Sequence, residues 1–163
     1  MVAVHRLSAD IYEADFDLIA LHSHLKDYAL AYSLNLFLKS GFCRRRTDLD
    51  ISSHIRIPIF EWKDDINERY WTFFANHGKS NEKLGEDGAR KGLFVGQPSG
   101  NHFHMVPEYR EADYFLKIEQ EGFESHRKAQ NGRLVKSLQG IPKIWMAYSI
   151  ETEHLKSRNN LIF

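Results

Sequence analysis

The longest regular pattern of hydrophobic positions lies between residues 16 and 39, a segment without proline or glycine. Apolar side chains recur there at helical spacing on two stripes instead of one. The first stripe contains Phe16, Ile19, Ser23, Leu30, Leu34 and Phe37, and the second contains Leu18, Leu21, Leu25, Tyr28 and Tyr32. Acidic residues at its start and Gly41 after its end are typical of helix boundaries. We therefore predict one long helix over residues 16–39 that lies on a sheet and is also covered on its flank by another helix, a loop or a partner subunit.

A period of two marks residues 51–60, where positions 51, 55, 57 and 59 are all isoleucine. β-Branched residues that alternate in this way are typical of a strand with one face on the core. Pro58 cannot donate a backbone hydrogen bond, so it indicates a sheet edge or a bulge. The polar residues 63–67 predict a turn, and the aromatic segment 69–76 predicts the returning strand of a hairpin.

Shorter patterns predict further strands over residues 2–7, 93–95, 102–106, 112–119 and 143–150. A weaker helical pattern covers residues 125–138 and is interrupted by Asn131 and Gly132. Residues 77–91 mix glycine, serine, asparagine and charged residues without apolar periodicity, so we predict a mobile loop there.

The order of these elements predicts the fold class. Runs of neighbouring strands, with helices grouped near the ends of the chain, favour an α+β fold. We expect an antiparallel β-sheet of about five to seven strands, with one long N-terminal helix and one shorter C-terminal helix packed mainly on one face. The 163 residues fit a single domain over 1–163, in which 151–163 form a C-terminal tail.

Composition and charge limit the classes of partner. With 42% apolar and 27% charged residues the chain is globular, and its 22 basic and 22 acidic residues cancel. Because the net charge is zero, there is no long-range positive field that would attract nucleic acid or anionic lipid, and we regard both as unlikely partners. Cys43 is the only cysteine, which excludes an internal disulfide and a cysteine-based zinc site. No apolar stretch approaches the roughly 20 residues that span a bilayer, and we expect a cytoplasmic protein.

Residues 106–114 read Val-Pro-Glu-Tyr-Arg-Glu-Ala-Asp-Tyr. This segment resembles the signature of the bacterial IPExxxVDY family, with Val106 in place of isoleucine and Ala112 in place of valine. Residues 16–19, 23–28 and 155–163 are also similar to that family, whereas 77–91 and 97–101 depart from it most. The resemblance implies a small bacterial protein of this size, and it implies nothing about catalysis.

The family-like segments also contain the strongest candidates for chemistry. If the 24–28 segment faces the 106–114 segment, carboxylates, a lysine and a phenol converge in one cleft that suits acid–base catalysis or ligand binding. The candidate residues are Lys26, Asp27, Glu108, Asp113 and Tyr114. In the structural alternative, the aspartates accept backbone hydrogen bonds and the tyrosines are core residues with one end in water.

Two histidines suggest a weaker candidate site for a metal ion. His102 and His104 lie two apart on a predicted strand and therefore project from one face, as two ligands of one ion would. Glu108, His77 or His54 could supply a third ligand. The alternative is that both histidines are simply solvated near a turn. Phosphate-binding glycine loops and other cofactor motifs are absent, so we expect no cofactor.

The predicted hairpin combines rings and basic residues in the way that single-stranded nucleic acid requires. The residues concerned are Arg44, Arg45, Arg46, Arg56, Trp62, Lys63, Arg69, Tyr70, Trp71 and Phe73. The alternative is that the rings are core residues, because neighbouring aspartates neutralise the basic ones.

The chain ends in Leu161, Ile162 and Phe163, and such an apolar end docks either on its own domain or on a neighbouring subunit. Together with the doubly apolar helix and the lack of a catalytic motif, it favours a non-enzymatic binding or scaffold module. Such a module acts through protein–protein contacts or self-association. Two alternatives stay open: a small ligand-binding protein or enzyme that uses the cleft, and a protein that binds single-stranded nucleic acid.

Overall fold

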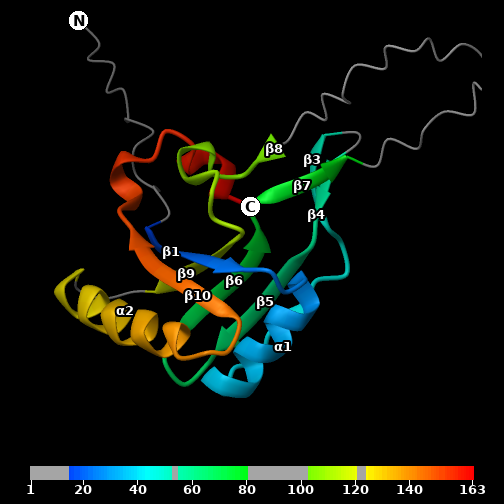
Figure 1. The fold of residues 1–163 in the computed structure, drawn as a ribbon. Helices are drawn as coiled ribbons and strands as arrows, with labels where there is room; N and C mark the ends of the chain where they lie inside the picture. The colour runs from blue at the N-terminus through cyan, green and yellow to red at the C-terminus, as the bar shows by residue number, and fades with distance from the viewer. Residues whose placement is uncertain (1–14, 53–54, 81–102, 121–123) are drawn as a thin grey trace, which may run out of the picture.

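A six-stranded antiparallel sheet forms the centre of the computed structural model, which describes residues 15–52, 55–80, 103–120 and 124–163. The strands, in order across the sheet, are β10 (Ile144–Ile150), β1 (Phe16–Ser23), β9 (Tyr114–Gln120), β6 (Arg69–Ala75), β5 (Ile59–Asp64) and β2 (Cys43–Arg44). Helices α1 (Asp27–Leu38) and α2 (Glu124–Gln139) both lie below this sheet in Figure 1. The predicted α+β class is confirmed, with an antiparallel sheet and the helices on one face.

The predicted helix over residues 16–39 is wrong in its first half, because Phe16–Ser23 form strand β1. This strand lies between β10 and β9, and both of its faces are buried. Ile19 and Leu21 face the helices, whereas Leu18 and Ala20 face the opposite core. A strand buried on both faces is hydrophobic at nearly every position, so it lacks the alternation that distinguishes a strand from a helix.

The lengths of the two helices are also the reverse of those predicted. α1 has 12 residues and α2 has 16. α2 continues through Asn131 and Gly132, where an interruption was expected, and the side chain of Asn131 is buried. Each helix packs a few aliphatic residues on the sheet, such as Leu34 from α1 and Leu138 from α2.

The predicted strand over residues 51–60 is divided into parts of two sheets. β3 (Leu49–Ser52) and β4 (Ile55–Ile57) belong to a smaller sheet, and Pro58 separates β4 from β5. Proline has no backbone N–H to donate to a neighbouring strand, which explains a break at this position. The hairpin of β5 and β6 is confirmed, with a turn over residues 65–68.

The smaller sheet has the order β3, β4, β7 and β8. Its strand β7 (His77–Ser80) corrects the prediction of a loop for the first residues of 77–91, because these residues extend β6 and pair with β4. β8 (Phe103–His104) is only two residues long, since the chain leaves the strand at Met105. The predicted strands over 2–7 and 93–95, and the remainder of the predicted loop, lie outside the described residues.

Two hydrophobic cores result, one on each face of the main sheet. Under the helices lies a core that contains Phe73 and Leu116, and on the other face lies a core that contains Phe74 and Phe115. This second face is covered by short 3₁₀ turns, which lie above the sheet in Figure 1: η2 (Pro107–Tyr109), η3 (Thr152–His154) and η4 (Arg158–Leu161). Leu155 and Leu161 belong to the second core, so residues 152–161 dock on their own domain.

Candidate functional site

Helix α1 is nearly free of charge, which is unusual for a helix with an exposed side. Asp27 is the only charged residue among its 12 residues. The helix follows Lys26, whose carbonyl accepts a hydrogen bond from the Leu30 amide at 2.9 Å. It ends at Lys39, whose φ of 54° lies in the left-handed region that commonly terminates helices.

One face of α1 packs on the sheet through Leu30, Ala31 and Leu34. At 100° per residue, the side of the helix away from the sheet carries two tyrosines, two small residues and a leucine, and Phe37 lies at its edge, about 20° from Leu30. These six residues form what we call the outer face of α1: Tyr28, Ala29, Tyr32, Ser33, Leu36 and Phe37.

The large side chains of the outer face are open to solvent. The exposed fractions are 61% for Tyr28, 69% for Tyr32, 61% for Leu36 and 51% for Phe37. A helix that is apolar on all sides is normally buried on all sides. The outer face therefore has the composition of a contact surface, but none of the described residues covers its large side chains.

A second apolar group adjoins the start of α1. Trp145 and Met146 of β10 are 51% and 49% exposed, and the ring centroid of Trp145 lies 4.1 Å from that of His24. His24 precedes α1 by only three residues. β10 is an outer strand of the main sheet, and the Gln139 side chain donates to its Ala147 carbonyl at 2.9 Å.

The structure brings Asp113 and Tyr114 next to the segment that leads into α1. The Ser23 amide donates to the Asp113 carboxylate at 2.9 Å, and the Tyr114 hydroxyl donates to the Leu25 carbonyl at 2.5 Å. Burial, together with the nearby charges of Asp27 and Asp113, raises the pKa of Tyr114 to about 12. Both side chains thus hold the β1–α1 connection in place.

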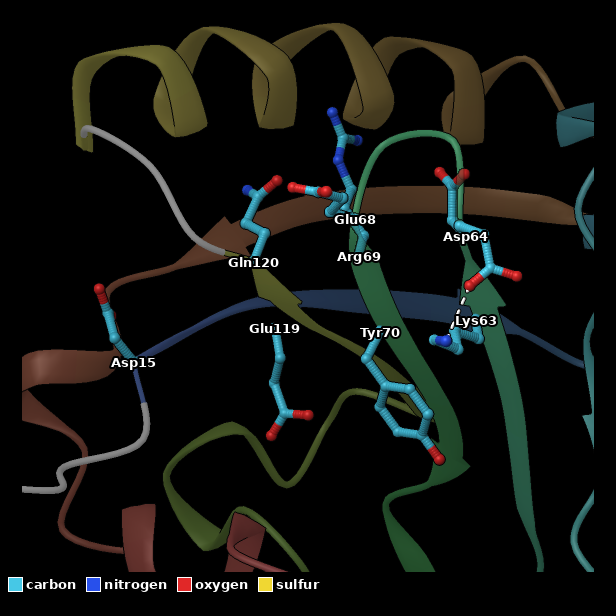
Figure 2. Close-up of a pocket in the computed structure, with 9 residues that line it drawn as sticks. Asp15, Lys63, Asp64, Glu68, Arg69, Tyr70, Glu119 and Gln120 are labelled. Atoms are coloured by element: carbon cyan, nitrogen blue, oxygen red, sulfur yellow. Dashed lines mark ion pairs between the residues drawn. The ribbon is translucent and has the colours of Figure 1, made fainter.

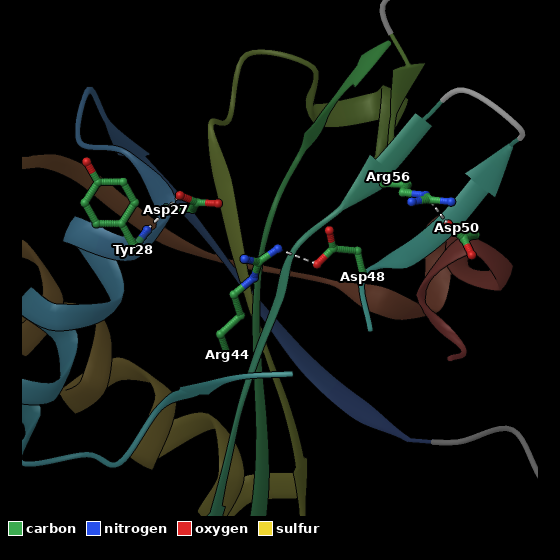
Figure 3. A network of polar contacts seen from close by, with 6 residues as sticks. All are labelled: Asp27, Tyr28, Arg44, Asp48, Asp50 and Arg56. Atoms are coloured by element: carbon green, nitrogen blue, oxygen red, sulfur yellow. Dashed lines mark hydrogen bonds and ion pairs between the residues drawn. The ribbon is translucent and has the colours of Figure 1, made fainter. Parts of the chain in front are cut away.

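Lys26 and Asp27 lie at the start of α1, close to this contact. The Asp27 carboxylate accepts a hydrogen bond from the Tyr28 amide at 2.8 Å, as Figure 3 shows. An acidic side chain in the first turn also interacts favourably with the helix dipole. Lys26 is exposed. The 24–28 and 106–114 segments therefore meet through the Tyr114–Leu25 hydrogen bond, and Asp113 binds the adjacent Ser23.

Glu108 does not join this group. It lies with the C-terminal residues on the face away from the helices, where the Ser157 amide donates to its carboxylate at 2.9 Å. Partial burial acts against ionisation, but hydrogen bonds from Ser157 and from the backbone outweigh it and lower the pKa of Glu108. The five candidate residues are thus divided between the two faces of the sheet.

Asn76 is a key polar residue that sequence reasoning missed. Its side chain is fully buried at the point where β6 passes into β7. The amide group donates to the carbonyls of Tyr109 and Ala112, and its oxygen accepts from the Val106 amide, all at 3.0 Å. Its own backbone bonds to Met105 and Asp113, both at 2.9 Å. Segment 106–114 is therefore held in its shape by this one side chain and by its own bonds to Ser23, Leu25 and Ser157.

The candidate metal site is only partly described. His104 of β8 pairs with His77 of β7, and their ring centroids lie 4.7 Å apart in an edge-to-face arrangement. His102 and His54 lie outside the described residues. In the described ranges no group of three or more histidine, cysteine, aspartate and glutamate residues is placed to hold a metal ion.

A hollow of about 560 Å³ lies at the turn of the β5–β6 hairpin, shown in Figure 2. Its lining residues are Asp15, Lys63, Asp64, Asp65, Glu68, Arg69, Tyr70, Glu119 and Gln120. Several of the charges are already paired, as Lys63 is with Asp65 at 2.9 Å. Burial and a hydrogen bond to Glu61 raise the pKa of Tyr70 to about 12, so this phenol stays neutral near pH 7. The lining includes none of the five candidate catalytic residues, but it includes Lys63, Arg69 and Tyr70 of the nucleic-acid hypothesis.

A second hollow of about 420 Å³ lies between α2 and the ends of β1 and β10. The Arg127 guanidinium crosses it to the Asp15 carboxylate at 2.6 Å. Its lining also includes none of the candidate residues. The salt bridge pairs two of the charges at this hollow, whose lining also includes Asp17, Lys128, Glu151 and Glu153.

The aromatic residues of the hairpin are largely core residues. Trp71 and Phe73 are buried, and their rings pack against Phe42. The neighbouring basic residues form ion pairs, and Figure 3 shows Arg44 with Asp48 at 2.7 Å and Arg56 with Asp50 at 2.9 Å. Trp71 and Phe73 therefore cannot stack on nucleotide bases while the protein is folded, whereas Trp62 is partly buried and Tyr70 is 37% exposed.

Neither described helix has the length and apolar character to cross a bilayer. In comparisons with known proteins, no family model, curated protein or solved structure matches the chain. Evidence on function therefore comes from the residues and their geometry.

Proposed function

We propose that this protein is a non-enzymatic binding module that acts through protein–protein contacts made by the outer face of α1. The observation that carries this proposal is the exposure of four large apolar side chains on one helix, each more than half open to solvent. Exposed apolar side chains that gather on one element are typical of interaction sites in soluble proteins.

The size of the surface supports the proposal. Aromatic side chains expose about 150–250 Å² when fully open, so the four large residues of the outer face offer about 450 Å² together. Functional patches on monomers lie in the range of about 300–600 Å². The area is therefore sufficient for recognition of another protein.

The roles of the candidate catalytic residues also favour binding over catalysis. Asp113, Tyr114 and Glu108 each bond to a backbone group that fixes a connection or the C-terminal segment. A general acid or base instead needs an open position beside a substrate. These three residues also lie outside the lining of both hollows described above.

The proposal is tested by photo-crosslinking with the full chain in cytosol of the source cells. A photoreactive phenylalanine analogue replaces Tyr32 in one variant and Ile66 in a control variant. Ile66 is also apolar and is 93% exposed, but it stands alone on the hairpin turn. We expect discrete protein adducts from position 32, including adducts with a second copy, and none of these from position 66.

A further variant tests whether the adducts from position 32 depend on the outer face of α1. Adding Leu36→Lys to the position-32 variant places a charge one turn away on the outer face and should suppress the adducts. Adducts that are equal at positions 32 and 66, or that persist with Leu36→Lys, would show that the outer face is not a binding surface.

A further inference from the structure

The hollow of about 420 Å³ between α2 and the ends of β1 and β10 contains a buried amide group. Asn131 lies on the same side of α2 as Leu134 and Leu138, because the three residues are spaced three and four apart. Both leucines pack against the core under the helices. Asn131 therefore also faces the sheet, where the residue is 7% exposed and lines the hollow.

The fold makes no use of this carboxamide. In the described part of α2, the side chains of Ser137 and Gln139 make hydrogen bonds, but that of Asn131 makes none. Its nitrogen and oxygen are not sealed by neighbouring protein atoms, so they open to the hollow. Asparagine is also a poor helix former, and burial of an amide without a hydrogen bond costs stability. A group with these costs is explained if it binds a molecule in the hollow.

The charges around Asn131 favour a cation. The lining has four carboxylates and two basic side chains, which leaves a net charge of −2: Asp15, Asp17, Glu151 and Glu153, against Arg127 and Lys128. Asp15 is paired with Arg127, and one oxygen of Asp17 accepts a hydrogen bond from the Gln120 amide at 2.9 Å. Glu151 and Glu153 are exposed, so they border the side that is open to solvent. In the described ranges these carboxylates do not form a group that could hold a metal ion, so an organic cation suits them better.

The rest of the lining is largely apolar. Phe16, Leu18 and Ile150 are buried lining residues that present an apolar wall. The volume of about 420 Å³ lies within the roughly 300–1,000 Å³ of small-molecule sites. An apolar wall together with an amide and exposed carboxylates suits a ligand with a short alkyl chain and a polar group at each end.

We propose that this hollow binds a short alkyl diamine. One ammonium group donates to Oδ1 of Asn131, and the alkyl chain packs on Leu18 and Ile150. The second ammonium group pairs with the carboxylates of Glu151 and Glu153 at the open side. This site lies at α2 and does not depend on the outer face of α1.

NMR titration of the purified full chain with 1,4-diaminobutane tests the proposal. The side-chain amide resonances of Asn131 should shift saturably, with a Kd of about 1 mM, because so small a ligand makes few contacts. Two compounds of the same chain length are controls: 1,4-butanediol has neutral ends, and succinate has negative ends. Both should bind at least about tenfold more weakly, since neither supplies a positive charge.

Variants of the lining identify the groups that bind. Asn131→Leu keeps nearly the same volume but removes the amide, and it should bind the diamine about tenfold more weakly, as read from the backbone amide of Gly132. Its thermal midpoint should be at least equal to that of the wild type, because leucine is the better helix former and needs no hydrogen-bond partner. Glu151→Gln combined with Glu153→Gln should weaken binding by about threefold, the size expected of an exposed ion pair. Glu111→Gln, at an exposed residue outside the lining, should leave binding unchanged.

Four results would overturn the proposal. The first is the lack of a saturable shift at Asn131, and the second is equal binding of 1,4-butanediol, which would mean that the carboxamide is simply hydrated. The third is unchanged affinity in Asn131→Leu, or equal affinity in the double glutamine variant and Glu111→Gln. The fourth is an Asn131→Leu variant that is destabilised or unfolded, because the amide would then have a role in the fold. None of these results bears on the outer face of α1, so the two proposals are tested separately.

Discussion

Asn76 satisfies more backbone groups than any other side chain in the described part of the molecule. It fills the gap between the β6–β7 strand and residues 105–113, where the chain is too irregular for regular strand pairing. Buried amide and carbonyl groups without a partner are costly, so this residue allows the irregular segment to be buried at all. In the sequence it is an asparagine at the end of an aromatic strand, with no sign of a special role. Its role could not be predicted, because its partners Val106, Tyr109 and Ala112 lie 30 or more residues away along the chain.

Replacement of Asn76 by alanine should therefore be severely destabilising. The substitution removes three side-chain hydrogen bonds and leaves their buried backbone partners unpaired, at a cost of about 3 kcal/mol or more in the free energy of unfolding. Urea denaturation followed by circular dichroism measures this loss. Asn159→Ala is the matched control, because Asn159 is exposed and its change should alter stability by less than about 0.5 kcal/mol. Equal losses in the two variants would show that the Asn76 network is not important for stability.

Most elements were predictable from the sequence, and β1 was the main exception. β5, β10 and α2 keep polar or exposed positions and were identified correctly. β6 and β9 are buried on both faces over most of their length, but Thr72 in β6 and Lys117 and Glu119 in β9 interrupt their apolar runs, and both were also identified as strands. β1 is hydrophobic on both sides and was taken for helix, although the pattern of apolar stripes in α1 itself was correct. The second apolar stripe, which includes Tyr28 and Tyr32, led us to predict that another element covers this side of α1. In the structure both side chains are exposed.

The two sides of α1 should respond differently to the same substitution. Leu34 is fully buried against the sheet, whereas Leu36 is 61% exposed on the outer face. We expect Leu34→Ala to lower the free energy of unfolding by about 2–5 kcal/mol, because it leaves a cavity in the core. Leu36→Ala should change it by less than about 0.5 kcal/mol in dilute, monomeric protein. Chemical denaturation of both variants at low concentration measures the difference, and a large loss for Leu36→Ala would mean that the outer face is covered within the monomer.

On the scale of the whole molecule, the C-terminal segment completes the second core. Leu161 is fully buried, and the Asn160 side chain donates to the Met105 carbonyl at 3.0 Å. Phe163 packs edge-to-face on Phe74, and the buried Lys117 ammonium lies 5.2 Å from its ring centroid. The apolar end of the sequence indicated docking, but the sequence could not specify the surface, because residues from three distant parts of the chain form it.

The contact between Glu108 and this segment should depend on pH. The pKa of Glu108 is lowered from its ordinary value of 4.5, so the carboxylate favours the folded state. Its contribution is present above pH 4.5 and is lost as pH falls through the lowered pKa. The amide resonance of Ser157, followed by NMR, should therefore titrate with a midpoint below 4.5.

Two variants separate this titration from general acid effects. Glu108→Gln should abolish it, whereas Glu111→Gln, a change at a nearby exposed residue, should preserve it. A Ser157 midpoint at or above the ordinary value, or a titration that survives Glu108→Gln, would contradict the proposed contact.

The strand order has a consequence for how the protein is made. β1 is flanked by β9 and β10, so Leu18 pairs with Lys117 and Ile150, both far downstream in the chain. At about 5–20 residues per second, the ribosome takes on the order of 10 s to synthesise those partners after β1. During that delay the largely apolar strand β1 has no neighbouring strand with which to pair, which makes it the natural binding target for a chaperone on the nascent chain.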